Sequence, residues 1–432
     1  MKYPFLILIF SFLVRAQNNL QFYLEAAEKN SALINDYKNQ TNANELEIIK
    51  LKSLYLKPQI NILVNYLLSP VIGKVDNQYR LEVNSSGNKF ETSANGISNY
   101  YGYDLAYSNG GQYQAMIHLI QPIFNKQRYL SAIDPLLISN QINQNNIKLT
   151  KHDLQKIITD QYILCYQDKL QINFTESILK VIEEQKNILN ELVKNGIYKK
   201  SDRILLEIES QNYLSQINLY KSYYKRDLLD LNILCGINDT SGVEIENPQL
   251  SLNTFSGESN FLQKYKLDSL SLVAQQKVFE IKYKPQINFF ANTGLNAVYA
   301  PTIPQRLGMS AGINFTYNLY DGKQKRTNET KTKILNTTIS YYKEFFITQN
   351  NVRKAKVLSE LKSITERISI LQKQLQEYDE LLNVYKKEIL SGQMSIINYI
   401  NIIKNLISLQ KDYAVLITQR FYLINTFNYW NW

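Results

Sequence analysis

The chain has 432 residues and a formal charge of +10, enough length for two or three domains or for one elongated domain. The basic charge and the 32 tyrosines would suit a nucleic-acid binder, but lysines and arginines are interleaved with acidic residues along the helical stretches and do not cluster, which argues against that class. Only two histidines occur, His118 and His152, with no Gly-rich phosphate loop, so we expect no metal, no cofactor and no enzyme.

Residues 1–16 have the pattern of a secretory signal. Lys2 precedes an apolar stretch from Phe5 to Val14, and small residues occupy the cleavage positions. The apolar stretch is too short to span a bilayer as a helix, and no later run of 18 apolar residues occurs. We therefore expect export of a mature chain that begins at Gln17.

The sequence contains an internal duplication. "KPQIN" occurs at 57–61 and at 284–288, and "AMIHLIQPIF" at 115–124 aligns with "AGINFTYNLY" at 311–320. Gly196 and Gly392 follow these two segments at the same distance. Three matches in the same order predict two repeats, at 17–236 and 261–427, joined by a linker at 237–260. The signal segment at 1–16 precedes them, and a short tail at 428–432, which we expect to fray, follows them.

Each repeat predicts the same order of elements: a helix, a strand, a loop, a return strand and a very long helical stretch. In the first repeat these are a helix at 20–56, a strand at 60–68, a return strand ending near Phe124, and a helix at 127–194. In the second they are a helix at 261–283, a strand at 287–295, a return strand ending near Tyr320, and a helix at 323–390. The two hairpins therefore cover 58–124 and 285–320.

The long helical stretches predict side-by-side packing. Apolar residues from Val357 to Ile389 recur at alternating steps of four and three, which is a heptad seam. The seam resumes at Ile396, beyond Gly392, and glycine is the usual residue just after a helix end. We expect Gly392, and its counterpart Gly196, to reverse the chain between antiparallel helices. Cys165 and Cys235 fall in these helices, and their spacing does not decide between a disulfide and two buried apolar side chains.

The strands alternate between apolar and polar residues. Met309, Ala311, Ile313 and Phe315 share one face, and Asn314 and Thr316 share the other, while His118 occupies the repeat position of Asn314. A soluble sheet with one wet face gives the same alternation. Four strands cannot close a barrel and open edges cannot face lipid, whereas three chains supply twelve strands, which close around a lumen. We therefore predict that the first set faces lipid and that Asn314, Thr316 and His118 face the lumen.

The segment "GINFTYNLYDGKQKR" resembles the alternating strand and Leu-Phe-Asp-Gly-Gly-basic stretch of the TolC-like outer-membrane factors, also called outer membrane efflux proteins. Here Tyr320 takes the Phe place and Lys323 the second Gly place. The resemblance covers about residues 18–427. It implies an α+β homotrimer, with a 12-stranded outer-membrane β-barrel continued by a long antiparallel α-helical coiled-coil tunnel in the periplasm. It also implies a passive exit duct of a tripartite efflux pump or type I secretion system, recruited by a periplasmic adaptor (membrane fusion) protein and an energised inner-membrane transporter.

In that family the two glycine turns lie at the periplasmic end, and acidic residues often follow the second turn. Asn398 and Asn401 occupy those positions here, while Asp202 keeps a carboxylate after the first turn. These three residues form the candidate entrance constriction. The other residues just after the turns, expected to narrow the same opening, are Met394 and Ile397 on the second turn and Tyr198, Lys199, Lys200 and Arg203 on the first. Asp202 fits equally well as a helix N-terminal cap. The alternative function is a periplasmic coiled-coil scaffold or adaptor whose strands form a small soluble sheet.

Overall fold

A computed structural model describes residues 19–69, 71–75, 78–82, 110–255, 257–297 and 300–432. The expected signal segment and most of the longer hairpin loop lie outside these ranges. The chain divides into two compact units. The strand unit comprises Gln40–Ile142 and Leu267–Ile339, and the hairpin unit comprises Met1–Asn39, Asn143–Lys266 and Ser340–Trp432. Each unit therefore contains parts of both sequence repeats, so the units do not coincide with the repeats.

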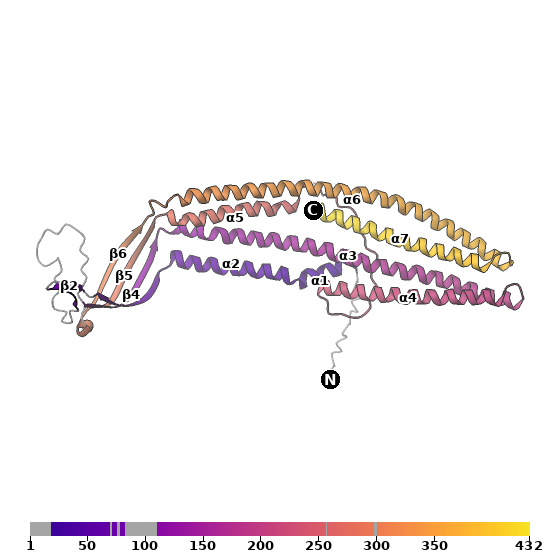
Figure 1. The fold of residues 1–432 in the computed structure, drawn as a ribbon, viewed down its shortest axis with the longest axis horizontal. Helices are drawn as coiled ribbons and strands as arrows, with labels where there is room; N and C mark the ends of the chain where they lie inside the picture. Colours follow the sequence, from indigo (N-terminus) through magenta and orange to yellow (C-terminus); the bar gives the residue numbers. More distant parts are fainter. Residues whose placement is uncertain (1–18, 70, 76–77, 83–109, 256, 298–299) are drawn as a thin grey trace, which may run out of the picture. The chain divides into compact units, whose positions relative to one another are not determined.

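The strand unit contains one four-stranded antiparallel sheet (Figure 1). Its strands are β1 (Gln59–Ser69), β4 (Gly110–Ile123), β5 (Gln286–Ala297) and β6 (Leu307–Thr316), in the order β1-β4-β5-β6. The two predicted hairpins are thus adjacent, and β4 pairs with β5 to join one repeat to the other. β1 and β6 form the two edges. A further small hairpin, β2 (Val71–Val75) with β3 (Gln78–Glu82), lies in the segment expected to be only loop.

Helices flank every strand of this sheet (Figure 1). α2 (Ala32–Leu56) leads into β1, and α5 (Gln263–Phe279) leads into β5 through η2 (Glu280–Tyr283). α3 (Lys126–Lys194) follows β4, and α6 (Gln324–Leu390) follows β6. The return helices are α4 (Lys200–Cys235) and α7 (Ile396–Trp430); the remaining helices are α1 (Leu20–Asn30), η1 (Asn260–Leu262) and η3 (Ala300–Gln305). No helix of the described chain is both long enough and apolar enough to span a membrane.

The hairpin unit is held by two apolar clusters. One gathers side chains from α3, α4, α6 and α7 beside the two glycine turns, among them Leu189, Leu206, Ile389 and Tyr399. The other packs α1 against α3 and α4. All ten predicted seam residues from Val357 to Ile389 are buried or half-buried. Fully burying an apolar side chain stabilises by about 1.5–3 kcal/mol and half-burying it by less, so the seam contributes to holding α6 in the hairpin unit.

The structure corrects three sequence expectations. The first predicted helix breaks at Ser31, whose hydroxyl accepts a hydrogen bond from the Ile34 amide at 3.3 Å and so starts α2 anew. β6 ends at Thr316 and not near Tyr320, because its partner β5 begins opposite at Gln286, directly after a proline. The tail does not fray: α7 continues to Trp430 and the following Trp432 packs against the hairpin unit.

Candidate functional site: the sheet faces and the glycine turns

One face of the four-stranded sheet is apolar across all four strands. The register places Ile62 beside Ile117, Thr293 and Met309 in one row, and Ile313 beside Phe289 in another. Large apolar side chains on this face are widely exposed: Ile60, Ile62, Val64, Tyr66, Ile117, Phe289, Leu307, Met309, Ile313 and Phe315. Monomeric soluble proteins rarely expose an apolar patch that spans a whole sheet, so this face requires a partner or a lipid surface.

The opposite face is mainly polar. His118 pairs across the strands with Asn292, whose side-chain amide donates to the Ser310 hydroxyl at 3.2 Å. Nearer the helix end of the same face, the Thr316 hydroxyl donates to the Asn314 side-chain carbonyl at 3.1 Å. The register thus brings the residues assigned to the lumen, namely His118, Asn314 and Thr316, onto one face, and those assigned to lipid, namely Met309, Ala311, Ile313 and Phe315, onto the other. What each face contacts remains a prediction.

The junction between β6 and α6 is fixed by Asp321, the aspartate of the motif on which the family resemblance rests. Its carboxylate accepts hydrogen bonds from the Tyr283 hydroxyl and, at 2.7 Å, from the Lys325 amide in the first turn of α6. Gly322 and Lys323 adopt positive φ angles of 63° and 70° between the strand and the helix. Asp321 therefore caps α6 and ties its start to the segment before β5.

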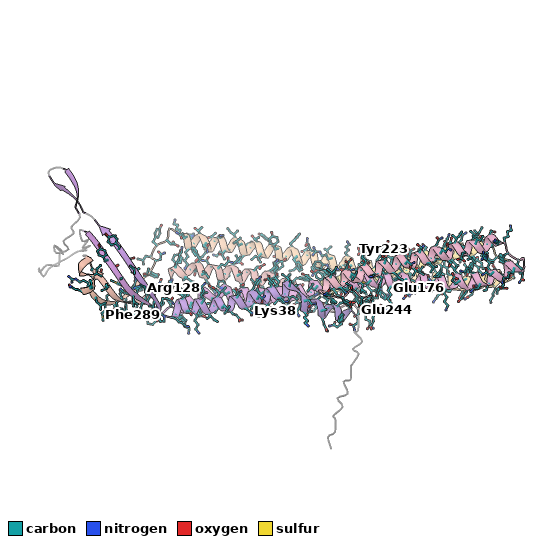
Figure 2. The ribbon with its side chains drawn as sticks, turned by 90° about the horizontal axis from the view of Figure 1, so that it is seen from below. Lys38, Arg128, Glu176, Tyr223, Glu244 and Phe289 are labelled. Atoms are coloured by element: carbon teal, nitrogen blue, oxygen red, sulfur yellow. The ribbon has the colours of Figure 1, made fainter. Side chains whose placement is uncertain are left out.

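Arg128 performs the corresponding role in the first repeat. From the first turn of α3, beside the strand ends (Figure 2), its guanidinium donates to the main-chain carbonyls of Ile281 and Lys284 at 3.0 and 2.8 Å. The Lys284 ammonium in turn donates to the Ser131 hydroxyl at 2.7 Å. These bonds attach the start of α3 to the lead-in of β5, so the two repeats are joined where strands become helices. Sequence reasoning did not identify Arg128, because its partners are main-chain atoms about 150 residues away.

The two glycine turns are in contact with each other. Gly196 and Gly392 have φ angles of 77° and 72°, the left-handed conformation that glycine adopts without strain. The Tyr198 hydroxyl donates to the main-chain carbonyl of Met394 at 2.7 Å, and the carbonyl of Ile389 lies 3.2 Å away. Burial and the nearby carboxylate of Asp202 raise the pKa of Tyr198, which keeps the hydroxyl protonated as a donor. The sequence placed Tyr198 among the residues after the first turn but did not predict that its hydroxyl would bind the second turn.

The candidate constriction residues have separate roles in the described chain. The Asp202 carboxylate accepts a hydrogen bond from the Lys199 amide at 3.0 Å, so it caps α4. Asn398 and Asn401 lie one turn apart on the exposed side of α7. Met394 was expected to line an opening and instead is 8% exposed and packs into the cluster between the turns. Nearby Lys404 pairs with Glu209 at 2.8 Å.

The described residues contain no group of three or more His, Cys, Asp or Glu side chains placed to hold a metal ion. Cys165 and Cys235 are both free and fully buried, and burial raises the pKa of the Cys235 thiol to about 12. Unreactive, protonated thiols of this kind pack as small apolar side chains.

The described chain thus combines a four-stranded sheet, apolar on one face, with a helix attached to every strand. No protein-family model and no curated protein matches the sequence. Solved structures match over nearly the whole chain. The outer membrane protein VceC of Vibrio cholerae is 10% identical, with 95% of each chain covered and a TM-score of 0.68. The CmeC outer membrane channel of Campylobacter jejuni is 12% identical, with 95% of this chain and 85% of that one covered and a TM-score of 0.64.

The open-state MtrE outer membrane channel of Neisseria gonorrhoeae is 11% identical, with 96% of this chain and 89% of that one covered and a TM-score of 0.68. At such low identities the likeness establishes the fold alone. The predicted resemblance to TolC-like outer-membrane factors is thereby confirmed at the level of the fold.

Proposed function

We propose that three copies of this chain form an exit duct in the outer membrane. The observation that carries the proposal is the apolar sheet face, which is exposed on all four strands while both sheet edges remain open. Three such sheets joined edge to edge would close into twelve strands, satisfy the backbone groups of β1 and β6, and turn the apolar face to lipid. The likeness in fold to outer membrane channels supports this location.

The duct would be passive. It would receive its cargo from an energised inner-membrane transporter through a periplasmic adaptor, as in a tripartite efflux pump or a type I secretion system. The sheet would form the wall of the barrel, and the long helices would form the tunnel. The helical turns at Gly196 and Gly392 would be the end that meets the adaptor. Asn398 and Asn401 would then lie near the opening, where their exposed amides carry no charge.

Fractionation, mass measurement and conductance test this proposal together. The chain should stay in the outer-membrane pellet after a carbonate wash, have the mass of three copies in detergent, and conduct ions in a planar bilayer. Recovery as a soluble periplasmic monomer would refute the duct and would support the alternative, a periplasmic scaffold or adaptor with a small soluble sheet.

A further inference from the structure

The helix end of the sheet has a strong excess of positive charge. Where β1, β4, β5 and β6 meet their helices, the following cations occur: Lys52, Lys57, Lys126, Arg128, Lys282, Lys284, Lys323, Lys325, Arg326 and Lys331. The acidic residues in the same segments are Glu280, Asp321 and Glu329. At the other end of the four strands, the described residues 66–69, 110–114, 294–297 and 305–309 include one cation, Arg306, and the small hairpin of β2 and β3 adds Lys74, Arg80 and Glu82. The charge therefore distinguishes the two ends of the apolar face.

Several of these cations are available to a partner. Lys323, Arg326 and Lys331 are exposed and line a shallow groove of about 510 Å³ along the first turns of α6, together with Thr327, Thr330, Ile334 and Leu335. In the described chain none of the three cations forms an ion pair with a carboxylate. The neighbouring Asp321 carboxylate is already engaged by Tyr283 and the start of the helix, and Glu329 is half-buried.

The groove adjoins the apolar face. Phe315 and Ile313 lie just before it in β6, 65% and 69% exposed. Tyr320 at the junction is 80% exposed, and Phe124, at the corresponding position of the first repeat, is 86% exposed. Aromatic side chains are enriched where a membrane meets water, and long basic side chains extend from there towards lipid phosphates. Side chains on a helix lean towards its N-terminus, which directs those of Arg326 and Lys331 towards the strands.

We propose that this basic groove, defined by Lys323, Arg326 and Lys331, binds the headgroups of anionic phospholipids in the leaflet that faces the helices. The proposal rests on the outer-membrane duct proposed above. The acyl chains would lie along Ile313 and Phe315, the phosphates would meet the three cations, and the Thr327 hydroxyl would donate to a phosphate oxygen, since the Thr330 hydroxyl already donates to the Arg326 carbonyl at 3.0 Å. The charged groove would fix the depth of the sheet in the bilayer and would favour anionic over zwitterionic lipids.

Lipid titration of the purified full-length trimer, read by native mass spectrometry, tests the proposal. The probes are phosphatidylglycerol, phosphatidylcholine and inorganic phosphate. The variant Lys323→Gln/Arg326→Gln/Lys331→Gln should bind phosphatidylglycerol on the order of 100-fold more weakly, since each cation near a lipid surface contributes about fivefold. Its affinity for phosphatidylcholine should be unchanged. The matched control Lys362→Gln/Arg367→Gln/Lys373→Gln removes the same three charges from exposed sites further along α6 and should bind like the original.

Equal phosphatidylglycerol affinities in the groove variant and the control would overturn the proposal. Displacement of the lipid by an equal concentration of inorganic phosphate would also overturn it, because the groove would then be a site for free anions. If the triple variant does not assemble, Lys323→Gln and Lys331→Gln are measured singly, and each must weaken phosphatidylglycerol binding about fivefold. If the trimer stays in the outer membrane but fails these tests, the lipid site is refuted and the proposed duct still stands. If the chain is soluble, both proposals are refuted.

Discussion

The hydroxyl of Tyr198 lies 2.7 Å from the main-chain carbonyl oxygen of Met394, and this hydrogen bond joins the two glycine turns of the chain. Tyr198 follows the first turn and Met394 follows the second. Because Met394 is itself buried in the apolar cluster beside the turns, the bond links a helix start in one repeat to the core of both.

Tyr198→Phe keeps the ring and removes this bond. We expect a loss of about 1 kcal/mol in local stability, with carbonyl groups of the second turn left to solvent. Amide hydrogen exchange around Gly392 should accelerate about fivefold. Tyr220→Phe, which removes the hydroxyl of a half-buried tyrosine in α4, is the control. Similar exchange rates at Gly392 in both variants would show that the Tyr198 bond does not hold the turns together.

The two turn glycines should differ in their tolerance of a methyl group. Both adopt positive φ, so Gly196→Ala and Gly392→Ala each cost about 1–2 kcal/mol of backbone strain. A Cβ at Gly196 would meet open space, whereas one at Gly392 would lie 2.9 Å from Cγ2 of Ile197. Gly392→Ala should therefore lower the free energy of unfolding more than Gly196→Ala does.

Ile197→Ala provides the control for this comparison, because it removes the side chain that a methyl group at Gly392 would meet. In that background the cost of Gly392→Ala should fall to that of Gly196→Ala, a coupling that a double-mutant cycle measures by denaturant unfolding. Equal costs for the two glycine substitutions in the original chain would contradict the contact.

The local elements of this fold could be predicted because each has a short sequence period. The two-residue alternation predicted β1 and β6, and the steps of four and three predicted the buried seam of α6. Gly196 and Gly392 predicted the turns. The break at Ser31 was missed, because a serine within an apolar pattern is compatible with either a cap or a helix interior. The end of β6 was placed too late, since a strand ends where its partner ends and the partner is remote in sequence.

The candidate site was predicted less completely than the fold. Which residues share a sheet face follows from alternation, but the Arg128 bonds to main-chain carbonyls and the contact of Tyr198 with the second turn depend on tertiary packing. The tail gave no periodic signal, and its order comes from aromatic stacking: the His152 ring lies between Tyr429 and Trp432, at ring-centre distances of 4.8 and 4.1 Å. No pattern in a single sequence predicts contacts of this kind.

The two faces of β6 should respond in opposite ways to a charge. Ile313→Arg places a cation on the apolar face and should impair assembly, because Arg at the bilayer midplane costs about 2–4 kcal/mol per chain. Asn314→Arg changes the adjacent residue on the polar face and should assemble better. The measurement is the yield of trimer in the outer-membrane fraction. Equal yields would mean that the faces are assigned wrongly or that neither face meets lipid.

A buried pair of carboxyl groups should make the hairpin unit sensitive to pH. Burial and a hydrogen bond to Asp227 raise the pKa of Asp168 to about 7, and the Arg226 guanidinium pairs with the Asp227 carboxylate at 2.7 Å. A raised pKa of an acid means that the folded state favours its protonated form, so stability is fully present below about pH 4 and is lost as pH rises to about 7.

Asp168→Asn keeps the shape of the side chain and cannot ionise. We expect it to abolish the part of the stability loss between pH 4 and 7 that comes from this pair and to raise the thermal midpoint at pH 8. Asp230→Asn, an exposed acid on α4, is the control and should leave the pH profile unchanged. An identical decline with pH in the original chain and in Asp168→Asn would rule out the pair as its cause.

The uncharged exposed amides after the second turn should make the proposed duct weakly selective. A narrow opening lined by acidic residues attracts cations by focusing the field, and Asn398 and Asn401 supply no such charge, while the Asp202 carboxylate is engaged in capping α4. We expect a reversal potential near zero across a salt gradient in a planar bilayer.

Asn398→Asp/Asn401→Asp should shift this reversal potential towards cation selectivity and make the current sensitive to block by divalent cations. The control Asn212→Asp/Ser215→Asp adds the same charge to exposed sites on α4, away from the second turn, and should shift it less. Strong cation selectivity in the original chain that the first double substitution leaves unchanged would place the narrowest part of the pathway elsewhere.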